Sequence, residues 1–191
     1  MQKTSINPVS AHPTSPSDSL FNGMDKVRRP TDAFWKAVLT VTAIAGTLDI
    51  IAAHLHIWAV TGKFPAMLLK AIAGAAIGRS AMQGGAGTMA LGLFFHFFIS
   101  FAFTLFFFLL YPRVVLLRKN RYVVAAGYAL FTWAVMNYIV LPLSRLPWRA
   151  PSYADKQTYI GWVVLTLVFG LPIVFGASRH YKKRSVTRTG T

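Results

Sequence analysis

The residues best suited to chemistry in this chain are one carboxylate and several polar side chains set in long apolar runs. Asp49 lies near the middle of the first run, and His56 follows it by seven residues. Seven residues return a helix to nearly the same azimuth about 10 Å further along its axis, so a water or a group from another helix could join the two. His96 and Ser100, one turn apart in the second run, are the expected partners, and Asn137 in the third run completes the predicted intramembrane polar cluster.

This polar cluster allows two kinds of role. Histidine titrates near neutral pH, so a carboxylate beside histidines is suited to handling protons or ions within a membrane. The same groups can instead hydrogen-bond one another and fix helix packing, which such interhelical bonds do for roughly 0.6 to 2 kcal/mol. We favour the second interpretation, because it requires only ordinary pairing inside a helical bundle.

Enzymatic chemistry has little support in the sequence. There is no Gly-x-Ser-x-Gly motif, no cysteine and no pair of carboxylates within the apolar runs, so nucleophilic and paired-carboxylate catalysis are not predicted. The spacing of Asp49, His56 and His96 does not match a His-Glu-x-x-His zinc motif. Haem held between His96 and either His54 or His56 is an alternative of a different class. We expect no enzyme activity, no cofactor and no metal.

The apolar runs that carry these residues are long enough to cross a lipid bilayer. A helix rises about 1.5 Å per residue, so roughly 20 apolar residues span a hydrocarbon core of about 30 Å. Residues 64–79 are too short and too charged for a span and predict an interfacial or re-entrant helix. The sequence therefore predicts an all-α polytopic membrane protein, a four-transmembrane-helix bundle with spans over residues 35–61, 88–111, 122–143 and 160–177.

One face of the predicted helix over 88–111 differs from its phenylalanine-rich surroundings. Residues four apart lie on one helix face with a slow drift, and small or polar residues recur there at every fourth position. The stripe is expected to face the protein interior, and it consists of Thr88, Gly92, His96, Ser100 and Thr104.

Three residues near the predicted outer surface are candidates for contact with lipid headgroups. Arg79 closes the short apolar segment, and Arg149 lies in the connection between the third and fourth spans. Their guanidinium groups could bind lipid phosphate or serve as surface anchors. Trp148, beside Arg149, is a typical aromatic anchor at a membrane interface.

The charge distribution predicts how the spans are oriented. The chain has 20 Lys and Arg against 5 acidic residues and a formal net charge of +15. In a polytopic protein such cations gather on the cytoplasmic side and meet anionic lipid, so we expect the lipid bilayer rather than nucleic acid as partner. Because fourteen of the twenty cations lie in the N-terminal segment, the loop after residue 111 and the C-terminal tail, both termini are predicted to be cytoplasmic. Residues 1–30 predict a disordered tail, 31–178 the membrane domain and 179–191 a basic tail.

Two short motifs carry a family resemblance over about residues 87–145. The second predicted helix has His96 and Ser100 as His-x-x-x-Ser, and the third has Asn137 shortly before Pro142 and Leu143. In these features the chain resembles a group of bacterial four-helix inner-membrane proteins, of which the YagU type is the nearest, although that type has histidine at the position of Asn137. The resemblance implies a bacterial inner membrane and no particular reaction.

These observations predict an integral inner-membrane protein whose polar cluster is mainly structural, such as an accessory or envelope-homeostasis component. The alternative is a small transporter or proton-conducting module that uses Asp49 and His96. Such a module would be a homo-oligomer, because four short helices enclose little volume. A haem- or metal-binding membrane subunit is the third hypothesis.

Overall fold

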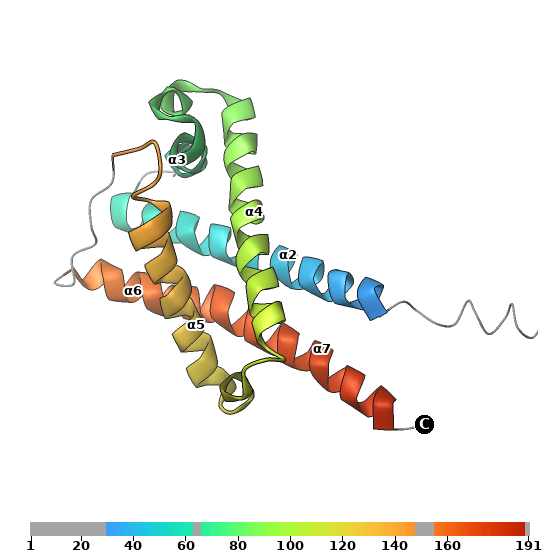
Figure 1. Cartoon of the computed structure of the whole chain (residues 1–191). Helices are drawn as coiled ribbons and strands as arrows, with labels where there is room; N and C mark the ends of the chain where they lie inside the picture. The colour runs from blue at the N-terminus through green and yellow to red at the C-terminus, as the bar shows by residue number, and fades with distance from the viewer. Residues whose placement is uncertain (1–29, 63–65, 148–154, 190–191) are drawn as a thin grey trace, which may run out of the picture. The chain divides into compact units, whose positions relative to one another are not determined.

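The computed structural model describes residues 30–62, 66–147 and 155–189 (Figure 1). The chain divides into two units, residues 1–33 and residues 34–191, and the contacts reported below lie within the second. Most of the predicted N-terminal tail, together with Trp148 and Arg149, lies outside the described residues.

The described part of the chain is mostly helical and contains no strand, which confirms the predicted fold class. Four helical stretches, residues 32–61, 86–110, 121–140 and 156–182, are long and apolar enough to cross a membrane, and a shorter apolar helix covers Met67–Ile77. In chain order the elements are α2 (Pro30–Thr61), α3 (Ala66–Ile77), the 3₁₀ helix η1 (Arg79–Gln83), α4 (Ala86–Leu110), the 3₁₀ helix η2 (Val115–Arg118), α5 (Arg121–Val135), the π-helix η3 (Met136–Val140), α6 (Lys156–Leu165), the π-helix η4 (Thr166–Gly170) and α7 (Leu171–Thr189).

The last helix runs beyond the span predicted to end at residue 177. α7 continues to Thr189 and includes most of the basic segment 179–191. Lys and Arg are good helix formers, and positive charge near a helix C-terminus is favourable. The cations that mark the end of the apolar run therefore do not end the helix.

Each π-helical turn ends two residues before a proline. Leu141, which precedes Pro142, donates its N–H to the Met136 carbonyl, five residues back. Leu171, which precedes Pro172, likewise donates to the carbonyl of Thr166. Proline has no N–H and its ring clashes with the carbonyl four residues earlier, so a wider turn accommodates the ring. The helix continues through Pro172 into α7, whereas the third span ends with η3 at Val140, before Pro142.

The helix ends next to the predicted cytoplasmic segments lie together. Near the start of α2, Phe34 lies with its ring centroid 6.0 Å from Phe108 on α4 and 5.9 Å from His180 on α7. Tyr111, just after α4, stacks on Tyr181 with centroids 5.4 Å apart. The start of α2, the end of α4 and the middle of α7 thus form one aromatic cluster in the second unit.

The other end of the bundle is joined through α3. Gly92 of α4 lies so close to α3 that an added Cβ would overlap the carbonyl of Leu69. The backbone N–H of Arg145, which follows η3, donates to the Ala75 carbonyl of α3 at 3.0 Å. An added Cβ at Gly74 of α3 would lie 3.2 Å from Leu146. The short apolar helix therefore lies against both α4 and the end of the third span.

The outward faces of the long helices are apolar. Large hydrophobic side chains on them are 39 to 67% exposed, among them Leu39, Leu48, Phe94, Leu130 and Val163. A soluble protein rarely exposes so much contiguous apolar surface, whereas in a bilayer these faces meet lipid. Together with the length of the four stretches, this defines an α-helical membrane protein.

Candidate functional site

The central polar contact of the predicted cluster joins α2 to α4. The His96 ring lies with Nε2 2.8 Å from the carbonyl oxygen of Gly46. A carbonyl oxygen only accepts hydrogen bonds, so Nε2 carries the proton and donates it. The two helices approach closely here because Gly46 has no side chain: an added Cβ would lie 2.9 Å from Phe97 and 3.3 Å from the Ser100 hydroxyl.

Asp49 lies beside this contact without accepting the histidine's Nε2 bond. It is half-buried on α2, three residues after Gly46, and its carboxyl group interacts electrostatically with His96. The predicted neighbours Asp49, His96 and Ser100 are therefore gathered at one helix crossing. The hydrogen bond that joins the helices uses the backbone, so it does not depend on the charge of the carboxylate.

The other predicted members of the cluster make local contacts. Asn137 donates from Nδ2 to the carbonyl of Trp133, one turn back on its own helix, at 2.9 Å. His54 contacts the Ile50 carbonyl through Nδ1 at 2.7 Å, and His56 is half-buried with no hydrogen bond found among the described residues. In the same part of the chain, no three His or Asp side chains lie close enough together to hold a metal ion.

The polar stripe of α4 faces inward, as expected. Gly92, Ser100 and Thr104 are buried, and Thr88 and His96 are half-buried. The Thr104 hydroxyl donates to the Ser100 carbonyl at 2.8 Å, so it is satisfied within its own helix. Only His96 extends from the stripe to another helix by a hydrogen bond among those found in the described residues.

Three further side chains join helices in the same way as His96, and sequence reasoning missed them. Tyr128 on α5 donates to the Phe103 carbonyl of α4 at 2.6 Å. Trp162 on α6 donates to Ala126 on α5 at 3.2 Å, and Tyr181 on α7 donates to Phe108 on α4 at 2.7 Å. The signal available in the sequence was an aromatic residue with a polar tip at an inward position, since such a tip needs a partner when it is buried. We call His96, Tyr128, Trp162 and Tyr181 the carbonyl-bound donors.

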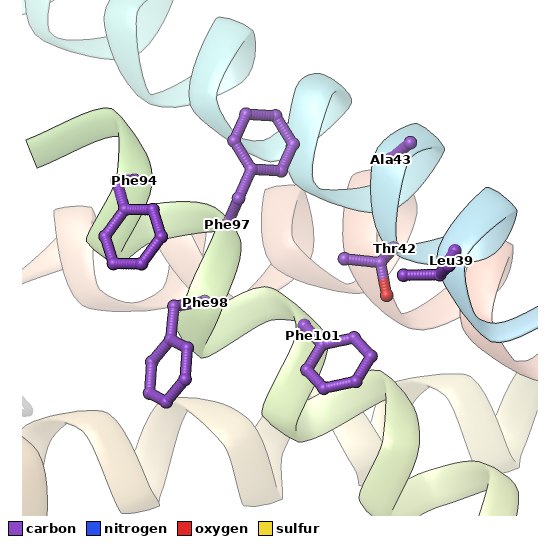
Figure 2. A pocket seen from close by; sticks show the side chains of 7 residues that line it. All are labelled: Leu39, Thr42, Ala43, Phe94, Phe97, Phe98 and Phe101. Carbon is purple, nitrogen blue, oxygen red and sulfur yellow. The ribbon is translucent and has the colours of Figure 1, made fainter. Parts of the chain in front are cut away.

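Two hollows in the described part of the chain bear on the candidate site. The first, about 330 Å³, opens between α2 and α4 and is lined by Leu39, Thr42, Ala43, Phe94, Phe97, Phe98 and Phe101 (Figure 2). The second, about 430 Å³, is lined by Arg79, Met82, Gln83, Leu146 and Pro147. Neither is lined by Asp49, His56 or His96, so the polar contact at Gly46 does not open into either hollow.

The first hollow is almost purely apolar. Its one polar member, Thr42, is only 6% exposed, and its hydroxyl oxygen is buried without a hydrogen-bond partner. The four phenylalanine rings come from consecutive turns of α4 (Figure 2). A surface of this kind suits hydrocarbon and offers no accessible polar group to a ligand.

Comparison with protein-family models, with curated proteins and with solved structures finds no match to this chain. Its four apolar helices, long enough to span a bilayer, place it in the class of α-helical membrane proteins.

Proposed function

We propose that this protein is a non-enzymatic component of a bacterial inner membrane, in an accessory or envelope-homeostasis role, whose intramembrane polar residues fasten its helices. The observation that carries the proposal is the shared geometry of the carbonyl-bound donors. His96 donates to a backbone carbonyl on a neighbouring helix just as two tyrosines and a tryptophan do. Tyrosine and tryptophan do not titrate near neutral pH, so a role common to all four is structural.

Two features support the proposed placement with both termini in the cytoplasm. The aromatic cluster groups the start of α2, the end of α4 and the middle of α7 at one end of the bundle. The segments adjoining these helix ends carry most of the cations, including Arg113, Arg118 and Lys119 after α4. Basic segments are held on the cytoplasmic side of a membrane, so one orientation satisfies all of them.

A second candidate, a small oligomeric proton-conducting module or transporter, rests on the electrostatic interaction of Asp49 with His96. A carboxylate within a membrane span is costly and commonly marks an ion or proton path. Under this hypothesis Asp49 and His96 exchange a proton. A second copy of the chain then completes a path that one copy is too small to enclose.

The two candidates separate in one reconstitution experiment. Wild-type protein and Asp49→Asn are inserted into liposomes that contain a pH-sensitive dye, and proton flux is followed after a potential is imposed. The structural proposal expects wild-type flux no greater than that of empty liposomes. Flux in the wild type that Asp49→Asn abolishes, with helical content unchanged, would overturn it in favour of the second candidate. Recovery of the protein in the soluble fraction after alkaline extraction of membranes would overturn both.

A further inference from the structure

The second hollow differs from the first in having exposed polar groups on its rim. Arg79 and Gln83, both on η1, present a guanidinium and a carboxamide, and both residues are exposed. Met82, Leu146 and Pro147 supply the apolar part of the lining. The lining thus combines a charged and a polar side chain with apolar ones, which matches a ligand with an anionic head and the beginning of a hydrocarbon chain.

The fold holds the two sides of this hollow together. Gly78 ends α3 with φ of 97°, a backbone conformation that suits glycine, and directs the chain into η1. From the other side, the N–H of Arg145 donates to the carbonyl of Ala75, and Leu146 packs beside Gly74. Both walls of the hollow are therefore fixed to α3.

No acidic side chain of the described residues balances the positive charge at the hollow. The acids in the described part of the chain are Asp32, Asp49 and Asp155, and none of them forms an ion pair with Arg79 among the contacts found there. An exposed guanidinium in this situation is free to bind a phosphate group through two parallel N–H donors.

The position of η1 along the chain, just before a membrane-spanning stretch, places the hollow at the level of lipid headgroups. Gln83 lies three residues before Ala86, where the second membrane-spanning stretch begins. This step relies on the membrane-spanning part of the proposed function. The volume, about 430 Å³, falls within the usual range for small-ligand sites, about 300 to 1,000 Å³.

From these observations we infer that the hollow between η1 and the segment after η3 binds the phosphate headgroup of an anionic glycerophospholipid. Arg79 holds the phosphate, and Gln83 hydrogen-bonds a phosphate or glycerol oxygen. The first methylenes of an acyl chain lie against Met82, Leu146 and Pro147. A free phosphate ion would use only Arg79 and Gln83.

Native mass spectrometry of the detergent-purified protein tests this inference with dihexanoyl phosphatidylglycerol as the probe. Arg79→Gln is expected to weaken binding about tenfold, because hydrogen bonds to charged groups are among the stronger single contacts. Arg79→Lys keeps the charge but loses the planar guanidinium group. Its affinity is expected to lie between those of the wild type and Arg79→Gln. Gln83→Leu is expected to weaken binding a few-fold. Lys156→Gln is the matched control: it removes one exposed cation at the start of α6, outside the lining of the hollow.

Several outcomes would overturn the inference. Binding unchanged in Arg79→Gln, or weakened equally in Lys156→Gln, would show that the hollow is not the site. Equal affinity for inorganic phosphate would identify a free anion as the ligand, and equal affinity for dihexanoyl phosphatidylcholine would show that net negative charge is not recognised. Should Arg79→Gln fail to fold, as judged by size-exclusion chromatography, Arg79→Lys and Gln83→Leu decide the question alone. Extraction of the protein from membranes by alkali is measured separately, so a failure of the membrane assignment is distinguishable from a failure of the site.

Discussion

At the scale of single residues, the helices are joined by side-chain donors that reach backbone carbonyls. A helical carbonyl has two lone pairs, so it can accept a second hydrogen bond while keeping its bond within the helix. In hydrocarbon there is no water to satisfy an N–H or O–H group, so a polar tip there needs a protein acceptor. His96 and Tyr128 both meet this need through a carbonyl on a neighbouring helix. For His96 the group that makes this bond is the ring N–H.

Replacing His96 tests this role directly. His96→Leu removes the donor to the Gly46 carbonyl and is expected to lower the free energy of unfolding by about 1 kcal/mol, the usual size of such interhelical bonds. The control is His56→Leu, which changes a half-buried histidine on α2 without a hydrogen bond found among the described residues. Equilibrium unfolding in mixed micelles measures both. Equal stability of His96→Leu and the wild type would contradict a fastening role for the bond.

The hydroxyl group of a tyrosine can be removed without changing the ring, so its hydrogen bond can be tested alone. Tyr128→Phe removes the hydroxyl that donates to the Phe103 carbonyl and keeps the ring that lies 4.6 Å from Phe107, measured between centroids. We expect a loss of about 1 kcal/mol in the free energy of unfolding.

Tyr122→Phe is the matched control for Tyr128→Phe, because Tyr122 is 67% exposed. Both variants lose one hydroxyl oxygen and keep the ring. They differ in that only Tyr128→Phe removes a buried hydrogen bond. The same unfolding measurement compares them, and a larger loss in Tyr122→Phe would refute the assignment.

At the scale of helices, glycines set how closely neighbours approach. An added Cβ at Gly92 would overlap the Leu69 carbonyl of α3, and at Gly176 of α7 it would overlap Val41 of α2. At Gly170 of η4 it would lie 2.6 Å from the Ala125 carbonyl of α5. Close contact through small residues is the main source of helix association where the hydrophobic effect is absent. The bundle therefore has a glycine at several of its helix crossings.

The crossing of α3 and α4 gives the sharpest test of this packing. Gly92→Ala places a methyl group against backbone rather than against a movable side chain, so the helices must separate, and we expect a loss of about 2 kcal/mol or more. Gly127→Ala is the control, since nothing lies within 4 Å of an added Cβ there and alanine favours helix. Thermal unfolding followed by size-exclusion chromatography should show a lower midpoint for Gly92→Ala and no loss for Gly127→Ala. A midpoint at Gly92→Ala equal to that of the wild type would contradict close packing of α3 on α4.

The helices themselves could be predicted because apolar length is a local property of the sequence. The inward direction of His96 and Ser100 also followed from their four-residue spacing. The carbonyl that accepts the His96 hydrogen bond could not be predicted, since every residue has a carbonyl. Only the missing side chain of Gly46 indicates that its carbonyl can be reached. The π-helical turn before Pro172 could not be predicted, because its form depends on packing on both sides of the turn.

At the scale of the whole second unit, the helix ends that adjoin the basic segments lie near one another. α4 brings its last turns beside α2 and α7, and α5 begins with Arg121, whose guanidinium carbon lies 5.4 Å from the ring centre of Phe175 on α7. The opposite helix ends are held by α3 through Gly92 and Arg145. The loop after α4 and the loop before α4 are therefore expected on opposite sides of the membrane.

This expectation can be tested by cysteine labelling, for which the chain is well suited because it contains no cysteine. Lys119→Cys marks the loop between α4 and α5, and Gly85→Cys marks the turn before α4, where an added Cβ meets nothing within 4 Å. With a membrane-impermeant maleimide applied to intact spheroplasts, we expect Gly85→Cys to react. Lys119→Cys should react only after the membrane is opened, since cations favour the cytoplasmic side. Labelling of Lys119→Cys alone in intact cells would reverse the orientation, and labelling of both would show that α4 does not cross the membrane.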